Sequence, residues 1–257
     1  MKKEIYLKGV TIGSGRPKIC VSLVGNSMER LIEEAKGLRS LEIDLVEWRV
    51  DFFEDNSNVK LVKEALEEIR HILPDIPLIF TFRTEREGGE KQLKIVDYFQ
   101  LNKEIMETDN IDLIDIELFT DKEKRKTLIE CAHANHLAVI VSNHDFDKTP
   151  SKDEIISRLC LAEEINGDIA KIAVMPCSAK DVITLLDATE TMYRTYAKGP
   201  IITMSMGSMG VVSRIAGEIF GSAVTFAAAK QVSAPGQIAV TELDQILKRL
   251  KQTKKEI

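Results

Sequence analysis

The sequence predicts an α/β protein of the (β/α)8 TIM barrel type, and three observations lead to this prediction. Short apolar runs rich in β-branched residues recur roughly every 25 to 35 residues, as the strands of an alternating fold do. Each run is followed by an amphipathic stretch with a helical period, which favours parallel strands joined by helices. The length of 257 residues is usual for a closed barrel. No G-x-G-x-x-G motif follows the first strand, which disfavours an open dinucleotide-binding sheet.

Residues 1–16 precede the first barrel strand and carry turn sequences at Lys8-Gly9 and Gly13-Ser14-Gly15. We expect them to form an N-terminal β-hairpin that closes the bottom of the barrel. The predicted strands cover residues 19–24, 44–49, 78–83, 113–118, 138–143, 169–174, 201–206 and 223–227. The predicted helices cover residues 27–40, 59–73, 90–108, 122–135, 152–166, 179–196, 210–220 and 238–252.

Several of these helices have recognisable start and stop signals. Ser151 followed by Glu154 is a capping box before the fifth helix. Gly167 ends that helix, and Gly199-Pro200 ends the sixth. After the last strand, residues 228–237 have the composition of a lid loop. Because no linker or short repeat interrupts the pattern, we expect residues 1–257 to form a single domain.

The composition narrows the classes of function. A net charge of −6 and a pI near 5.4 leave no general basic face for nucleic acid or anionic lipid. The four cysteines are scattered without a C-x-x-C pair, which favours reduced thiols over a disulfide or a metal site. No apolar run is long enough for a signal peptide or a membrane span. We therefore expect a cytoplasmic protein that binds neither nucleic acid nor a membrane.

The sixth predicted strand is a short apolar run that contains one lysine, Lys171, and ends before Pro176. A parallel strand covered on both faces makes an ammonium expensive to desolvate, and a buried ammonium commonly escapes by losing a proton. A neutral buried lysine is a nucleophilic amine that forms a Schiff base with a ketone. The strand alone leaves an alternative open. The lysine stem could pack while its head group reaches the strand end or pairs with a carboxylate.

Other polar residues fall where the predicted strands end, and in barrels these positions converge on one pocket. His144 ends the fifth strand and suits a proton shuttle, although a hydrogen-bonded core histidine is the alternative. Glu47, Arg49 and Asp51 share one face if the strand period of two holds, and a structural salt-bridge network is the alternative there. The remaining polar candidates at strand ends or in the following segments are Ser22, Arg83, Glu87, Asp115, Glu117 and Arg214.

Together these residues predict a pocket with one amine, one imidazole, several arginines and several carboxylates. Several cations around a small pocket imply an anionic substrate, and Arg214 suits a carboxylate through bidentate pairing. Carboxylates such as Glu47 suit substrate hydroxyls. With a single candidate histidine, no metal-ligand set is evident. The residues thus predict a polyhydroxylated keto acid processed through an imine on Lys171, with His144 as acid and base.

Five motifs occur in order between about residues 19 and 240. They are Glu47-Trp48-Arg49-Val50-Asp51, Thr81-Phe82-Arg83 with Glu87-Gly88-Gly89, Ser142-Asn143-His144-Asp145-Phe146, Ala170-Lys171-Ile172-Ala173 and Ser233-Ala234-Pro235-Gly236-Gln237. This set resembles the type I 3-dehydroquinate dehydratase family, whose members are lyases of the shikimate pathway to chorismate and the aromatic amino acids. A set of five motifs in order along the chain is far more specific than any one of its motifs.

The resemblance implies a Schiff base between Lys171 and the C3 ketone of 3-dehydroquinate. His144 would remove the C2 proton and protonate the departing C1 hydroxyl, a syn elimination that gives 3-dehydroshikimate, while Glu87 orients His144. Arg214 would bind the substrate carboxylate. No cofactor is implied, and a homodimer is expected. The implied substrate contacts are Ser22, Glu47, Arg49, Arg83, Met204, Met206, Arg214, Ser233 and Gln237, with Ser233 and Gln237 in the lid.

Two rival functions share parts of this pattern. A class I Schiff-base aldolase has the same fold and lysine, and residues 206–210 could mimic its phosphate site. A non-catalytic barrel that binds a keto acid as a sensor is the rival from a different class. A dehydratase that uses no covalent step is a third possibility.

Overall fold

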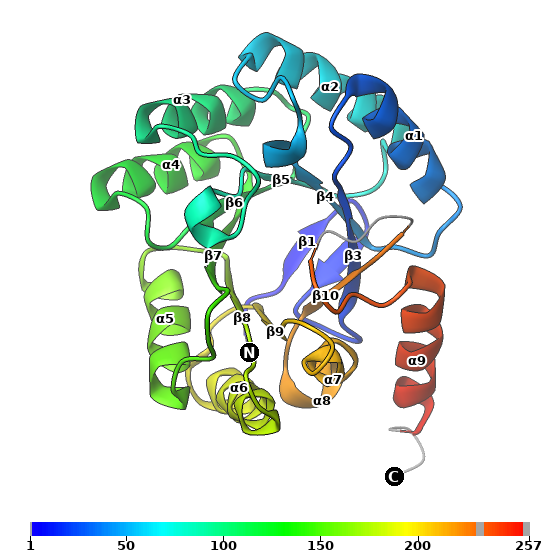
Figure 1. Cartoon of the computed structure of the whole chain (residues 1–257), viewed down its shortest axis with the longest axis vertical. Coiled ribbons are helices and arrows are strands. Elements are labelled where there is room, and N and C mark those ends of the chain that lie inside the picture. Colours follow the sequence, from blue (N-terminus) through cyan, green and yellow to red (C-terminus); the bar gives the residue numbers. More distant parts are fainter. Residues whose placement is uncertain (1, 230–233, 254–257) are drawn as a thin grey trace.

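The structure, a computed structural model, describes residues 2–229 and 234–253 (Figure 1). Eight strands form one sheet in the order β10-β3-β4-β5-β6-β7-β8-β9, and all the neighbouring pairs in this order are parallel. The backbone N–H of Ala223 donates to the carbonyl oxygen of Ile201 at 2.8 Å, which brings β10 beside β9 and closes the ring. The predicted (β/α)8 barrel is confirmed.

The observed elements follow the predicted alternation. The barrel strands are β3 (Lys18–Leu23), β4 (Leu45–Arg49), β5 (Leu78–Thr81), β6 (Leu113–Glu117), β7 (Ala138–Asp145), β8 (Ile169–Val174), β9 (Ile201–Ser205) and β10 (Val224–Ala227). The helices are α1 (Met28–Leu38), α2 (Val59–Ile72), α3 (Ile95–Met106), α4 (Lys122–Ala134), α5 (Lys152–Glu164), α6 (Ala179–Thr191), α7 (Val211–Ile215), α8 (Gly217–Phe220) and α9 (Val240–Thr253). Single turns η1 (Val50–Phe52), η2 (Glu85–Glu87) and η3 (Met192–Tyr196) complete the set. No helix in the described part of the chain is long and apolar enough to cross a membrane.

Two predicted helices differ from the structure. The helix expected over residues 210–220 is two short helices, α7 and α8, that meet at Ala216. The carbonyl oxygen of Arg214 accepts a hydrogen bond from Thr225 Oγ1 of β10 at 2.8 Å, so the helix loses an internal acceptor there. The helix expected from residue 90 begins only at Ile95, and in the preceding segment the backbone N–H of Glu90 donates to Asp51 Oδ2 at 3.2 Å.

The N-terminal hairpin forms as expected from β1 (Ile5–Leu7) and β2 (Val10–Ile12), which pair antiparallel. Lys8 and Gly9 both have positive φ angles, 44° and 82°, as a tight two-residue turn requires. Ile5 and Ile12 pack against the inward apolar side chains of the barrel. The hairpin therefore closes one end of the barrel, and in Figure 1 it lies across the ring of strands.

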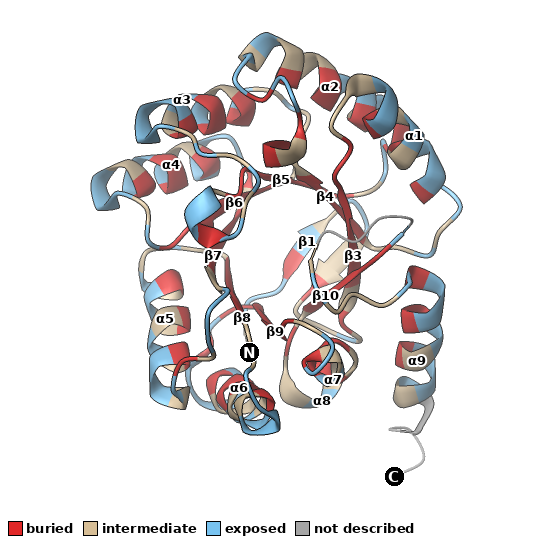
Figure 2. Ribbon diagram, in the orientation of Figure 1, coloured by how far each residue is buried: buried red, intermediate tan, exposed pale blue. Residues whose placement is uncertain are grey.

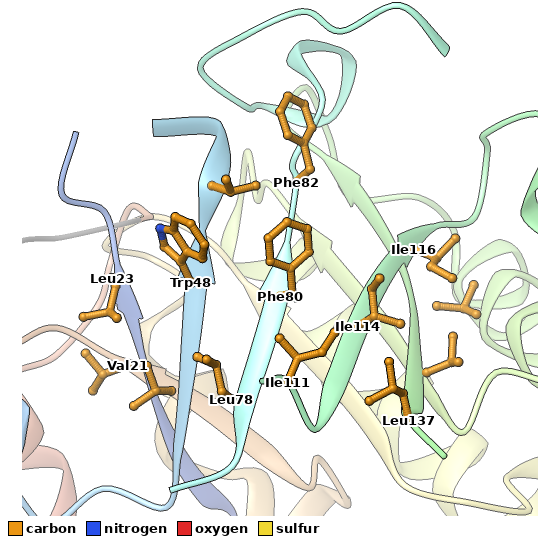
Figure 3. Close-up of a cluster of buried hydrophobic side chains, with 14 of the residues drawn as sticks. Val21, Leu23, Trp48, Leu78, Phe80, Phe82, Ile111, Ile114, Ile116 and Leu137 are labelled. Carbon is orange, nitrogen blue, oxygen red and sulfur yellow. The ribbon is translucent and has the colours of Figure 1, made fainter. Parts of the chain in front are cut away.

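The barrel strands are buried along most of their length, whereas the helices have buried and exposed residues (Figure 2). The period of two along each strand separates two apolar layers. Outward side chains such as Trp48 and Phe80 pack beneath the helices (Figure 3). Inward side chains near the start of the strands, such as Leu45 and Ile169, form a second cluster above the hairpin. Further along the same strands the inward positions become polar and buried, and these residues are Ser22, Glu47, Thr81, Asp115, Ser142 and Lys171.

Candidate active site

A cavity of about 240 Å³ lies at the carboxyl ends of the barrel strands. Every residue for which the family resemblance implies a catalytic or substrate-binding role lines it except Ser233, which lies outside the described residues. Asp51, Asp115 and Glu117, the other polar candidates at strand ends, are not among its lining residues. The cavity is also lined by side chains that the sequence-based predictions missed, Phe52, Glu90, Phe146 and Phe226 among them. The residues that line the cavity from the predicted set are Ser22, Glu47, Arg49, Arg83, Glu87, His144, Lys171, Met204, Met206, Arg214 and Gln237.

Lys171 projects from β8 into the barrel and is 5% exposed. Its Nζ lies 3.1 Å from Asp115 Oδ2 and 3.5 Å from Glu47 Oε1, and 4.8 Å from the centroid of the Phe226 ring. The amine therefore faces the cavity, as the Schiff-base prediction requires. The sequence had left open whether the lysine head group reaches the strand end or pairs with a carboxylate. In the structure the amine pairs with two carboxylates. Lys171 must hand on a proton before it can attack a carbonyl carbon.

Asp115 had no role among the sequence-based predictions, yet it makes the shorter of the two ion pairs to Lys171. It is fully buried on β6, and its Oδ1 accepts hydrogen bonds from Ser142 Oγ at 2.6 Å and from Arg83 Nη2 at 2.8 Å. Burial on its own raises the pKa of the Asp115 carboxyl. The nearby cations Arg83 and Lys171 outweigh burial, so the pKa lies below its usual value and the group is a carboxylate.

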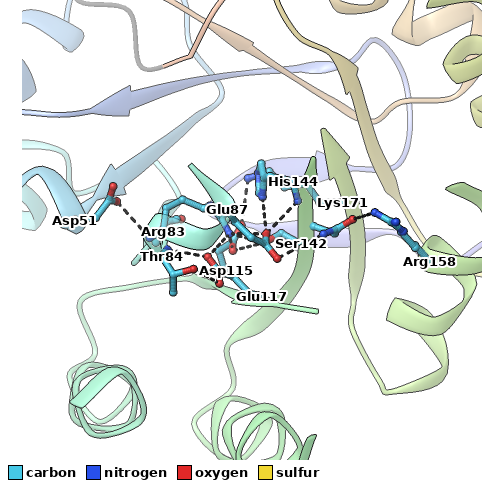
Figure 4. A network of polar contacts seen from close by, with 12 residues as sticks. Asp51, Arg83, Thr84, Glu87, Asp115, Glu117, Ser142, His144, Arg158 and Lys171 are labelled. Carbon is cyan, nitrogen blue, oxygen red and sulfur yellow. Dashed lines mark hydrogen bonds and ion pairs between the residues drawn. The ribbon is translucent and has the colours of Figure 1, made fainter. Parts of the chain in front are cut away.

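Arg83 links this carboxylate to a wider polar network (Figure 4). Its Nη1 donates to Glu117 Oε1 at 3.1 Å and to Ser142 Oγ at 2.9 Å. Burial acts to lower the pKa of Arg83, but Asp115 and Glu117 outweigh it and raise the pKa. These donors are committed to protein acceptors. A direct contact between Arg83 and substrate stays a prediction.

His144 and Glu87 form a pair beside Lys171 (Figure 4). Glu87 lies in η2, the turn after β5, and its Oε2 lies 3.0 Å from His144 Nδ1 and accepts the His144 backbone N–H at 3.0 Å. When Oε2 accepts from the ring as it accepts from the backbone N–H, the ring proton lies on Nδ1. The Nε2 lone pair is then free to take a proton.

Burial shifts the pKa values of His144 and Glu87 in opposite directions, and it favours the neutral form of each group. Burial, then the cations Arg83, Lys171 and Arg49, hold the pKa of His144 well below its usual value. Burial, with the neighbouring Glu117 carboxylate, raises the pKa of Glu87 to about 8. The imidazole is therefore neutral at physiological pH, which is the state of a general base.

Arg214, on α7, is a buried cation at 1% exposure. Its Nη2 donates to the Pro235 carbonyl oxygen at 2.9 Å and its Nη1 to that of Phe226 at 3.4 Å, while its Nε has no hydrogen-bond partner. Among residues 2–229 and 234–253, no carboxylate pairs with it. Burial lowers the pKa of Arg214 to about 10. A desolvated guanidinium without a counter-ion is suited to an anionic group that enters the cavity.

The charged motif at the end of β4 divides into two parts. The strand ends at Arg49, so Asp51 lies in the turn η1 rather than on the shared strand face. Arg49 pairs with Asp51 through two bonds of 2.8 and 2.7 Å, which fits the structural alternative for these two residues. Glu47 instead faces the barrel, where Ser22 Oγ donates to it at 2.7 Å and Thr81 Oγ1 at 3.0 Å.

Residues 234–237, which the structure describes within the predicted lid loop, pack against the segment that follows β9. The Gly207 N–H donates to the Pro235 carbonyl oxygen at 3.2 Å. Gly236 has a φ of 78°, and a Cβ there would lie 2.2 Å from the Gly207 carbonyl oxygen, so only glycine fits. Ala234, Pro235 and Gln237 thereby line the cavity beside Arg214.

These features are those of a barrel enzyme that acts on an anionic carbonyl compound through a lysine amine. The sequence model of the type I 3-dehydroquinase family matches residues 19–254, and the chain belongs to this family. The chain is 54% identical over 250 residues to the 3-dehydroquinate dehydratase of Clostridioides difficile, covering 97% of this chain and 98% of the relative. It is 55% identical over 247 residues to that of Bacillus licheniformis, covering 96% and 97%.

Solved structures agree with this assignment. The type I 3-dehydroquinate dehydratase of Clostridium difficile with covalently modified comenic acid superposes with a TM-score of 0.96 at 54% identity, covering 98% of this chain and 100% of that one. The enzyme of Geobacillus kaustophilus superposes with a TM-score of 0.95 at 38% identity, covering 98% and 99%. A 3-hexulose-6-phosphate synthase, at 16% identity and a TM-score of 0.61 over 89% of this chain and 99% of its own, shares the fold alone.

Proposed function

We propose that this chain, a hydro-lyase that dehydrates 3-dehydroquinate to 3-dehydroshikimate, works through a Schiff base on Lys171 with His144 as acid and base. The observation that carries the proposal is the single cavity lined by Lys171, His144 and an Arg214 without a carboxylate partner among the described residues. Membership of the family sets aside the aldolase and the non-catalytic sensor. The dehydration of 3-dehydroquinate is a step of the shikimate pathway.

In the first step the Lys171 ammonium passes one proton to a base, and the neutral amine attacks the C3 carbonyl carbon. A C–N bond forms, the carbonyl oxygen takes up protons and leaves as water, and the nitrogen remains as a protonated imine. The positive nitrogen withdraws electrons and makes the C2–H acidic. Arg214 supports this step by holding the substrate carboxylate, because its guanidinium is desolvated and no carboxylate in residues 2–229 and 234–251 pairs with it.

In the second step His144 Nε2 takes the C2 proton and the electron pair moves to the nitrogen as an enamine. The same imidazolium then gives its proton to the C1 hydroxyl, which leaves as water while the protonated imine reforms. Hydrolysis releases 3-dehydroshikimate and the amine. Glu87 holds the ring through the 3.0 Å bond to Nδ1 and keeps Nε2 available. Glu47 and Arg49 lie where substrate hydroxyls would be bound, and Met204 and Met206 supply apolar wall.

Chemical trapping tests this mechanism. Borohydride added with 3-dehydroquinate should add the reduced substrate to Lys171, detected by mass spectrometry of the digested protein. Lys171→Ala should lose both labelling and turnover, whereas Lys152→Ala, a partly exposed lysine of α5 that pairs with Asp187, should keep both. Full turnover by Lys171→Ala, or turnover without labelling of the unsubstituted enzyme, would establish a dehydratase that needs no covalent step.

We also propose that residues 1–257 form one domain and that the enzyme is a cytoplasmic homodimer. Exposed apolar side chains on the outer helices, such as Ile183 at 64% and Ile219 at 61%, support contact with a second copy. All four cysteines are free thiols, which supports a reducing compartment. Sedimentation velocity should give a dimer that Ile183→Lys weakens. A monomer at micromolar concentration would contradict the homodimer.

A further inference from the structure

Asp115 occupies a position that differs from that of the other carboxylates near Lys171. It is fully buried and is not among the described residues that line the cavity, so it lies behind the lysine rather than beside the substrate. Its Oδ2 points to Lys171 Nζ at 3.1 Å. Its Oδ1 is fixed from the other side by Ser142 Oγ and Arg83 Nη2 at 2.6 and 2.8 Å (Figure 4). The carboxylate is thus held rigidly against the nitrogen that reacts.

We propose that Asp115 is the counter-ion that keeps the Lys171 nitrogen positively charged after the imine has formed. Asp115 touches neither substrate nor the reacting carbon atoms, so it is a positioning residue that acts through Lys171. This inference rests on the Schiff-base chemistry proposed above. It assigns the protonation of the imine to one buried side chain on a strand, β6, that is not adjacent to β8 in the sheet.

The Lys171 nitrogen carries the same charge before and after the imine forms, so Asp115 can be its counter-ion in both states. An ammonium and a ketone give a protonated imine and one molecule of water, with no net change in the number of protons. The nitrogen therefore carries a single positive charge in both states and keeps one N–H after the C=N bond forms. A carboxylate 3.1 Å away, in a site closed to bulk water, stabilises that charge in either state.

Glu47 is the other carboxylate in reach, but its geometry suits a different task. Its Oε1 is farther from Nζ, at 3.5 Å, and already accepts from Thr81 Oγ1. Its Oε2 accepts from Ser22 Oγ, and the residue lines the cavity.

The ionisable groups that face Lys171 come from the surrounding strands, and they are Cys20 on β3, Glu47 on β4, Arg83 just after β5, Asp115 on β6 and His144 on β7.

The test compares two reducing agents over pH 6.5 to 9 in the presence of 3-dehydroquinate. Borohydride reduces neutral and protonated imines, whereas cyanoborohydride reduces the protonated form. Asp115→Asn keeps the size of the side chain and removes its charge. Glu117→Gln is the matched control, because Glu117 is also buried on β6 and also bonds Arg83, at 3.1 Å, whereas the carboxylates that pair with Lys171 are Asp115 and Glu47. Circular dichroism establishes that each variant is folded.

We expect borohydride to label Lys171 in all three proteins throughout this pH range. Cyanoborohydride labelling should stay constant with pH in the unsubstituted enzyme and in Glu117→Gln. In Asp115→Asn it should fall as the pH rises, with a midpoint lower by about 1 to 3 pH units, the effect of removing one adjacent opposite charge. Turnover should fall in parallel, since a neutral imine is a weak electron sink.

The outcomes separate the inference from the proposed function. An absence of borohydride labelling in the unsubstituted enzyme would defeat the Schiff-base mechanism itself. Borohydride labelling with the same cyanoborohydride profile in Asp115→Asn as in the unsubstituted enzyme would overturn the role of Asp115 alone, as would an equal shift in Glu117→Gln. If Asp115→Asn does not fold, the pH profile of cyanoborohydride labelling in the unsubstituted enzyme still tests the inference. A loss of its cyanoborohydride labelling between pH 6.5 and 9 contradicts the inference.

Discussion

Replacing Glu87 by glutamine should stabilise the protein at alkaline pH. Glu87 is 4% exposed, and burial followed by the Glu117 charge raises its pKa from 4.5 to about 8. Glutamine keeps the length of the side chain and one oxygen that can accept the two N–H groups of His144. It removes the carboxyl that burial disfavours in its ionised form.

The sign and size of this change in stability follow from the pKa of Glu87 in the folded and in the unfolded protein. A carboxyl whose pKa is higher in the folded protein contributes stability below the unfolded pKa of 4.5 and loses it as the pH rises through about 8. Between pH 6.5 and 8.5 the unfolded carboxyl is ionised throughout while the folded one gives up its proton. The free energy of unfolding should therefore fall by about 2 kcal/mol in the unsubstituted protein but not in Glu87→Gln. His144, whose pKa is lowered, affects stability at more acidic pH and leaves this window largely clear.

Urea unfolding at pH 6.5 and pH 8.5 measures this difference. The matched control is Glu85→Gln, an exposed position in the same turn η2. The advantage of Glu87→Gln over the unsubstituted protein should grow by about 2 kcal/mol between the two pH values, and Glu85→Gln should follow the unsubstituted protein. A constant difference between the Glu87→Gln and unsubstituted proteins would refute the reasoning, since it would mean that Glu87 does not change its ionisation in this range.

Three further predictions concern catalysis. His144→Ala should keep borohydride labelling of Lys171 but lower kcat by about 10² to 10⁴-fold, as loss of a general base does; loss of labelling would show that His144 is needed earlier. Arg214→Gln should raise KM for 3-dehydroquinate by about 10 to 100-fold, the loss of one or two charged hydrogen bonds, and an unchanged KM would exclude Arg214 as the carboxylate ligand. The acid limb of kcat/KM should lie below pH 6.5 because the pKa of His144 is lowered, and Arg49→Gln should move that limb upward by removing one of the cations that lower it. An unmoved limb in Arg49→Gln would show that Arg49 does not act on the His144 pKa.

The barrel could be predicted from the sequence because its strands and helices carry local signals. Residues 169–174 form β8 as expected, and β9 falls one residue short of residues 201–206. The break at Ala216 could not be predicted, because it depends on a hydrogen bond between Thr225 of β10 and the Arg214 carbonyl oxygen. That contact exists only after the barrel closes.

The site divides in the same way. The position of His144 and Lys171 at or near strand ends is a local property, and the rule that strand ends meet was enough to bring them together. The partner of Lys171 was not a local property, since Asp115 lies on β6 and the two strands are separated by β7. The sequence suggested an uncharged amine among arginines. Arg83 instead bonds Asp115 and Glu117, and Lys171 is ion-paired with Asp115 and Glu47.

The two inward layers of the barrel separate stability from chemistry along the chain. On β4 the apolar layer has Leu45 and the polar layer has Glu47; on β8 the corresponding pair is Ile169 and Lys171. Each of these two strands thus has its apolar core residue and its polar site residue two positions apart, about 7 Å along the strand. Side chains of the polar layer can therefore be exchanged to build new chemistry. The inward apolar layer and the N-terminal hairpin would keep the barrel closed at its other end.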